Sequence, residues 1–104
     1  MANYLLVYMG GGMADTPEGQ AKQMEAWGAW FGGMGAAVVD GGNPCGPSKT
    51  VASNGSVRDG GGAGIGGYSV IKANSLDEAA KLAKGCPVLA EGGSVEVYET
   101  FNAM

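Results

Sequence analysis

Residues 66–86 read GGYSVIKANSLDEAAKLAKGC and predict a strand followed by a helix. The first part of this stretch contains the aromatic and β-branched residues that strands favour. Ser75 is a typical helix N-cap, and Glu78 stands at the spacing of a capping box, in which both residues bind free backbone N–H groups. Gly85 is suited to the left-handed position that commonly ends a helix. The stretch therefore predicts a helix over residues 75–84.

The predicted helix carries a narrow apolar stripe. Its members recur at helical spacing and are mostly small: Leu76, Ala79, Ala80 and Ala83. Because small side chains allow close approach, the stripe predicts a helix that lies directly against a sheet.

The composition describes a small, acidic, glycine-rich chain. It has 104 residues, 21 of them glycine, and a formal net charge of −4. A chain of this length corresponds to one domain, here residues 1–104. The glycines stand between apolar runs and indicate turns. Since basic residues are few and scattered, neither nucleic acid nor an anionic membrane is an expected partner.

The N-terminal stretch, MANYLLVYM, has no basic segment and is too short for a signal peptide. No apolar run approaches the roughly 20 residues of a membrane span. Cys45 and Cys86 lack the spacing of a metal or redox motif, so two reduced thiols are expected. A cytoplasmic location is therefore expected.

The first half of the chain predicts a strand over residues 4–8 and then a helix opened by Thr16 and Pro17 as N-cap and first helical residue. Trp30 falls at the edge of the apolar face of this helix. The face itself is predicted to consist of Gln20, Met24, Trp27, Phe31 and Met34.

Further strands are predicted over residues 35–40 and 94–101. The second of these alternates clearly, with Val95 and Val97 on one face. Between them, residues 50–53 and 56–58 flank an Asn-Gly pair, which is the favoured pair of a type I′ turn and predicts a small hairpin.

The element order is strand, helix, strand, inserted hairpin, strand, helix, strand. This order predicts an α+β, ferredoxin-like fold in which two helices cover one face of an antiparallel sheet. The opposite face would stay bare in a single chain. A second copy is the expected cover, so the sequence predicts a homodimer.

Blocks spread over nearly the whole chain resemble the YCII-related family, of the DGPF type. They stand at residues 4–8, 27–31, 39–44, 67–71, 75–79, 84–87 and 92–97. The resemblance implies a dimeric α+β barrel. It also implies a role that is mostly unassigned, with small-molecule enzymes using an Asp–His pair proposed among its members.

The sequence contains no histidine. The usual acid–base group near neutral pH is therefore missing, and a carboxylate or tyrosine would have to replace it. Two scattered cysteines without histidine provide no zinc or haem ligand set, so no cofactor is expected.

Polar residues at strand ends, with tryptophans on the facing helix, form the candidate site. Asp59 and Asp40 are candidate bases and Tyr68 a candidate proton donor. The candidate ligand-binding residues are Trp30, Trp27 and Asn43. Structural roles remain open for several of them, because aspartates before glycines are common turn residues, Trp27 fits a core position and Tyr68 could pack locally on its strand.

Three functions are consistent with these observations. The first is a homodimeric small-molecule-binding domain that is catalytically silent because it lacks histidine. The second is an isomerase or lyase acting on a small cyclic or aromatic compound through Asp and Tyr. The third is a structural or regulatory dimer.

Overall fold

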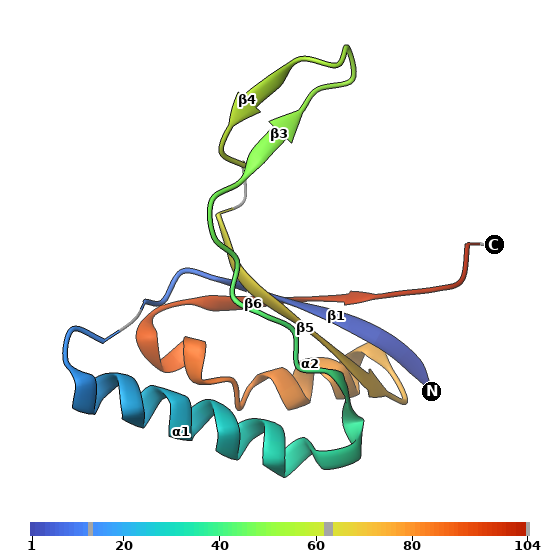
Figure 1. The fold of residues 1–104 in the computed structure, drawn as a ribbon. Helices are drawn as coiled ribbons and strands as arrows, with labels where there is room; N and C mark the ends of the chain where they lie inside the picture. The colour runs from blue at the N-terminus through green and yellow to red at the C-terminus, as the bar shows by residue number, and fades with distance from the viewer. Residues whose placement is uncertain (13, 62–63, 104) are drawn as a thin grey trace.

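The computed structural model describes residues 1–12, 14–61 and 64–103. Within them, four strands form one antiparallel sheet and two α-helices cover one of its faces (Figure 1). The strands lie in the order β2-β5-β1-β6. Their bounds are Ala2–Met9 for β1, Val38–Asp40 for β2, Ile65–Ala73 for β5 and Ser94–Glu99 for β6. This is the predicted α+β, ferredoxin-like arrangement.

Two strands are shorter than the sequence predicts. Residues 35–37 form a 3-10 turn, η1, so β2 begins only at Val38. Gly35 has a φ of 54°, which interrupts an extended path at the end of the preceding helix. At the other end of the chain, β6 stops at Glu99, and the Thr100 N–H donates to the Asn3 carbonyl beyond it.

Helix α2 (Leu76–Ala83) begins as predicted but ends differently. The Ser75 hydroxyl accepts from the Glu78 N–H at 3.0 Å, whereas the Glu78 carboxylate accepts from the Asn74 N–H. Gly85 does not adopt the predicted left-handed conformation. A Cβ on Gly85 would lie 3.1 Å from the ring of Trp30, so this glycine serves the close approach of an indole.

The small-residue stripe of α2 is also only partly buried. Ala79 and Ala83 are buried, and Leu82 packs against the core. Leu76 and Ala80 are exposed, which corrects the predicted stripe. The face that meets the sheet is rotated toward Leu82, as the short helix lies beside β5 and β6.

Helix α1 (Pro17–Met34) has the predicted start, because the Thr16 hydroxyl accepts from the Gly19 N–H. No side chain of this helix, whose residues are all described, is fully buried. Met24, predicted on the buried face, is 75% exposed. Trp27, Trp30 and Met34 do pack against the core. Helix α1 thus contacts the sheet mainly through its C-terminal half and leaves a gap beside its N-terminal half.

The core lies between the sheet and the helices. Alternate residues of β1 and β5 point into it and are buried; they are Tyr4, Leu6, Tyr8, Ser69, Ile71 and Ala73. The intervening residues point to the other face, where Leu5 pairs with Val70 and Tyr98 and where Val7 pairs with Tyr68. In the described part of the chain, no helix covers that second face (Figure 1).

A separate hairpin consists of β3 (Lys49–Val51) and β4 (Val57–Asp59). The Asn-Gly pair lies in its turn, as predicted, and Gly55 has a φ of 88°. The turn is not of the predicted type I′, because Asn54 does not have the positive φ that this type requires. The hairpin projects from the sheet on the side opposite the helices (Figure 1). Among the described residues, the hairpin adjoins the rest of the fold at its base (Figure 1).

Candidate functional site

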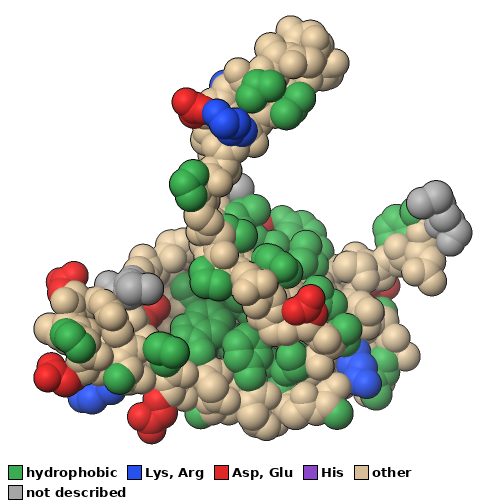
Figure 2. Space-filling model, viewed as in Figure 1, with side chains coloured by type: hydrophobic (Ala, Val, Ile, Leu, Met, Phe, Trp, Pro, Cys, Tyr) green, Lys and Arg blue, Asp and Glu red, His purple; other side chains and the backbone are tan. Residues whose placement is uncertain are grey.

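A pocket of about 550 Å³ lies between helix α1 and the sheet. It is formed by the exposed flank of α1, the end of β1, the start of β5, the segment 41–44 and the 3-10 helix η2 (Pro87–Glu91). Figure 2 shows hydrophobic side chains gathered in the middle of this face, below the projecting hairpin. The pocket has the size of a small-molecule site and its walls are largely apolar.

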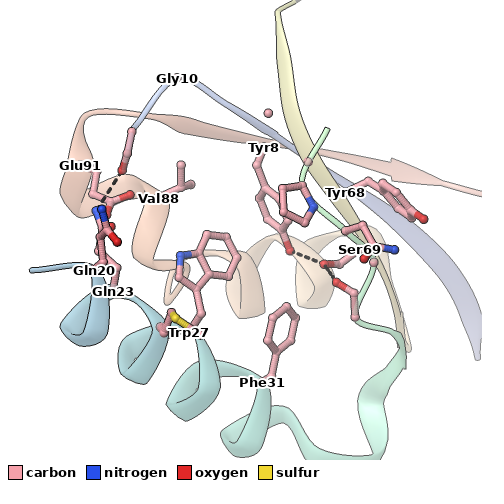
Figure 3. Close-up of a pocket in the computed structure, with 18 residues that line it drawn as sticks. Tyr8, Gly10, Gln20, Gln23, Trp27, Phe31, Tyr68, Ser69, Val88 and Glu91 are labelled. Carbon is pink, nitrogen blue, oxygen red and sulfur yellow. Dashed lines mark hydrogen bonds between the residues drawn. The ribbon is translucent and has the colours of Figure 1, made fainter. Parts of the chain in front are cut away.

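Three aromatic rings form its main wall (Figure 3). Trp27 meets Tyr8 edge to face, with ring centroids 4.9 Å apart, and Phe31 lies 5.9 Å from Trp27 on the next turn of α1. Rings in such arrangements hold one another in place. The three rings therefore form one packed surface although their helix is only partly buried.

At one end of the pocket, two hydroxyl groups form a short hydrogen-bonded chain. The Tyr8 hydroxyl donates to Ser69 Oγ, and Ser69 Oγ donates to the Gly41 carbonyl, both at 2.7 Å (Figure 3). Burial raises the pKa of Tyr8 to about 12. Tyr8 is therefore a neutral phenol at neutral pH, and its oxygen retains the capacity to accept a hydrogen bond.

At the other end, Gln23 and Glu91 are joined across elements. The Gln23 side-chain amide donates to the Glu91 carboxylate and to the Gly12 carbonyl, and its oxygen accepts from the Ala14 N–H. These contacts use both ends of the amide. They fix the carboxylate against the N-terminal half of α1 (Figure 3).

The segment 41–44 closes the side of the pocket and depends on a close backbone approach. Gly42 has a φ of 71°, and a Cβ there would lie only 1.7 Å from the Tyr68 carbonyl oxygen. The Tyr68 N–H donates to the Asn43 carbonyl, and Pro44 bridges to Gly67. The glycine therefore allows this segment to lie against β5.

Three of the six residues proposed from the sequence line this pocket: Trp27, Asn43 and Tyr68. The ring of Tyr68 points away from Trp27, toward the open face of the sheet (Figure 3). Tyr68 thus contributes to the rim of the pocket and not to its aromatic wall.

The other three lie outside it. The Asp40 carboxylate accepts from the Gly42 N–H at 2.8 Å, which is the turn role weighed against catalysis. Asp59 stands in the exposed hairpin, where it pairs with Lys49 at 2.6 Å. Trp30 packs against α2, and its indole N–H donates to the Leu82 carbonyl.

Five polar lining residues were not proposed as site residues from the sequence: Tyr8, Gln20, Gln23, Ser69 and Glu91. For two of them, the sequence contains a pattern from which the site could have been predicted. Tyr8 and Ser69 occupy inward positions of alternating strands, and a serine at such a position requires a buried hydrogen-bond partner. Gln23 and Glu91 stand 68 residues apart, and nothing in their local sequence links them.

No group of three or more metal-binding side chains occurs among the described residues. Likewise, no helix in the described part of the chain is long and apolar enough to cross a membrane.

We expect Ser69→Ala to lower the free energy of unfolding by about 1–3 kcal/mol, because it leaves the buried Tyr8 hydroxyl without its acceptor. Tyr8→Phe should cost less, about 1 kcal/mol, since the Ser69–Gly41 hydrogen bond survives it. Urea unfolding of both variants measures the two costs. A Ser69→Ala variant as stable as the wild type would show that the hydroxyl chain is not a structural feature of the folded protein.

The sheet order and the helix layer define a small ferredoxin-like domain with an aromatic pocket. A family model for the YCII-related domain matches residues 18–103, so the chain belongs to that family. A comparison with curated proteins found no match. The role of the family is uncharacterised, so the function has to be argued from the pocket.

Proposed function

We propose that this protein is a homodimeric domain that binds a small ring compound in the pocket between α1 and the sheet. The observation that carries this proposal is the aromatic wall of Tyr8, Trp27 and Phe31 in a pocket of about 550 Å³. Flat rings stack favourably on such walls, and a pocket of this size encloses most of a small ligand.

Binding is favoured over catalysis by the chemistry of the lining residues. The chain has no histidine, and neither Asp40 nor Asp59 reaches the pocket. Tyr8 stays protonated far above neutral pH. An isomerase or lyase would therefore depend on the remaining carboxylate, Glu91. Turnover of a bound ring compound that is lost in Glu91→Gln would support that alternative.

The two tryptophans allow a matched test of ligand binding. Titration with phenol should quench the fluorescence saturably, and Trp27→Phe should remove most of the change because Trp27 lines the pocket. Trp30→Phe is the control, since Trp30 does not line the pocket and donates its indole N–H to the Leu82 carbonyl, although its ring also contacts Trp27. If Trp30→Phe removes the signal and Trp27→Phe does not, the ligand binds elsewhere. No saturable quenching and no thermal stabilisation by phenol would contradict the proposal.

The open face of the sheet supports a dimer. It presents Leu5, Val70 and Tyr98 side by side on three neighbouring strands. An apolar sheet face of this kind is normally covered in a stable protein. A regulatory or structural role for the dimer is compatible with the same surface. A cytoplasmic location stays a prediction from the sequence.

Light scattering at micromolar concentration should give twice the mass of one chain. Val70→Lys should convert the protein to a monomer, because it places a charge in the centre of the open face. Leu76→Lys, at an exposed position of α2, should leave the dimer intact. A wild-type monomer at these concentrations would overturn the dimer.

A further inference from the structure

The charge of the pocket is one-sided. Among the described lining residues, Glu91 is the single charged side chain, and no lysine or arginine stands with it. The chain as a whole is acidic as well, with a net charge of −4. An anionic ligand would therefore be repelled by the Glu91 carboxylate, whereas a cationic ligand would be attracted to it.

The position of Glu91 is fixed by its neighbours. Gln23 donates to one carboxylate oxygen. The backbone of Gly11 lies against the other, since a Cβ on Gly11 would be 3.4 Å from Glu91 Oε1. Gln23 is itself held by Gly12 and Ala14. The carboxylate is therefore oriented before any ligand arrives, which lowers the entropy cost of binding.

The other end of the pocket also favours a ligand that donates. The Tyr8 hydroxyl proton is donated to Ser69 Oγ, and the Ser69 hydroxyl proton is donated to the Gly41 carbonyl. Neither proton is therefore free to bind a ligand. The lone pairs of the Tyr8 oxygen stay available to a ligand N–H or O–H. Between the two ends, the face of Trp27 is the aromatic surface that attracts a cation most strongly.

We propose that the ligand is a protonated amine that carries a flat ring. The ammonium group binds Glu91, and the ring lies against Trp27 and Phe31. This inference rests on the proposed function, because it assigns a chemical class to the ligand of the same pocket.

Three probes of nearly equal shape separate charge from shape: 2-phenylethylamine, 2-phenylethanol and 3-phenylpropanoate. Calorimetric titration at low salt should show the amine binding about tenfold more tightly than the alcohol, and the carboxylate more weakly than both. Glu91→Gln keeps an acceptor for Gln23 and should abolish the preference for the amine while leaving the alcohol unchanged. Glu25→Gln, outside the pocket on α1, removes the same charge and should change nothing.

The outcomes distinguish the two proposals. If the alcohol binds as tightly as the amine, or if Glu91→Gln retains the preference, the amine assignment fails and the ring pocket stands. If none of the three probes binds or raises the melting temperature, the pocket itself is not a ring-binding site and both proposals fail.

A second inference concerns the β3–β4 hairpin, which projects from the body of the chain. Val51 and Val57 face each other across its strands, yet they are 68% and 59% exposed. The Cα radius of gyration is 15.2 Å, against about 13 Å for a compact chain of this length. A lone two-stranded hairpin is at best marginally stable in water. The two valines therefore form an apolar surface on the hairpin that no other part of the described structure covers.

The hairpin lies on the side of the sheet that the helices leave open (Figure 1). A second copy placed on that open face would come within its reach. We infer that, in the dimer, the Val51–Val57 pair of each hairpin packs against the other copy. This inference rests on the proposed homodimer, but it is independent of what the pocket binds.

The double variant Val51→Thr, Val57→Thr tests this hairpin contact, because threonine keeps the shape and the strand preference of valine while replacing a methyl group with a hydroxyl. Sedimentation should show the dimer dissociating at least tenfold more readily, and Leu76→Thr on α2 serves as control. Amide exchange supplies a second reading, since the Ala52 N–H bond to Ser56 should be protected in the dimer. If the hairpin amides of the dimer exchange freely, or if the double variant has an unchanged dissociation constant, the hairpin contact is refuted and the dimer itself stands.

Discussion

Gly42→Ala is expected to lower the free energy of unfolding by about 3–5 kcal/mol, because two penalties act at one position. The left-handed conformation at a φ of 71° is costly for any residue with a Cβ. That Cβ would also lie 1.7 Å from the Tyr68 carbonyl oxygen, a backbone atom that cannot turn aside. The segment 41–44 would have to leave β5.

The displaced segment would lose the Asn43–Tyr68 backbone bond and the acceptor of the Ser69 hydroxyl. Urea unfolding followed by circular dichroism measures the cost, and a melting temperature suffices if the variant is too unstable for urea. Gly41→Ala is the matched control, since its Cβ meets nothing within 4 Å and its φ is not positive. Its stability should stay within about 1 kcal/mol of the wild type. Equal stabilities of the two variants would contradict the role given to Gly42.

Local sequence signals predicted the elements of this fold because each signal rests on short-range chemistry. Ser75 caps α2, and the Asn-Gly pair before Ser56 turns the hairpin, in both cases through bonds that span two to four residues. Such contacts are complete within the segment that encodes them. The order of the elements then fixed the sheet topology.

The errors concern tertiary packing. Helical spacing placed Met24 and Trp27 on one buried face, but α1 packs against the core through Trp27, Trp30 and Met34 and leaves Met24 exposed. Gly85 was expected to end a helix and instead makes room for Trp30. A helical periodicity reports which residues share a face; it does not report how far along the helix that face is covered.

The candidate site shows the same limit. Asp40 and Asp59 were proposed because they are polar residues at the ends of predicted strands, yet their partners are Gly42 and Lys49. The polar groups of the pocket pair residues that are far apart in sequence: Tyr8 with Ser69, and Gln23 with Glu91. Without an expected register, no local pattern predicts such pairs.

High pH should destabilise the protein mainly through two buried acids, Tyr8 and Cys86, although burial also raises the pKa of Tyr4. Burial raises the pKa of Tyr8 from 10.0 to about 12 and that of Cys86 from 9.0 to about 11. In both cases the folded-state pKa lies above the unfolded one. The stability that each group contributes is therefore complete below its unfolded pKa and is lost as the pH rises through its folded pKa.

The free energy of unfolding should therefore fall between pH 9 and pH 12, by about 2–3 kcal/mol for each group. The decline due to Cys86 begins near pH 9 and the decline due to Tyr8 near pH 10. Urea unfolding at half-unit steps of pH gives the curve of unfolding free energy against pH.

The quantity to compare between variants is the slope of this curve, because Tyr8→Phe and Cys86→Ala also change stability at neutral pH. Tyr8→Phe should flatten the curve above pH 10, and Cys86→Ala should flatten it from pH 9 to 11. A wild-type slope that persists in both variants would show that neither buried acid controls alkaline unfolding.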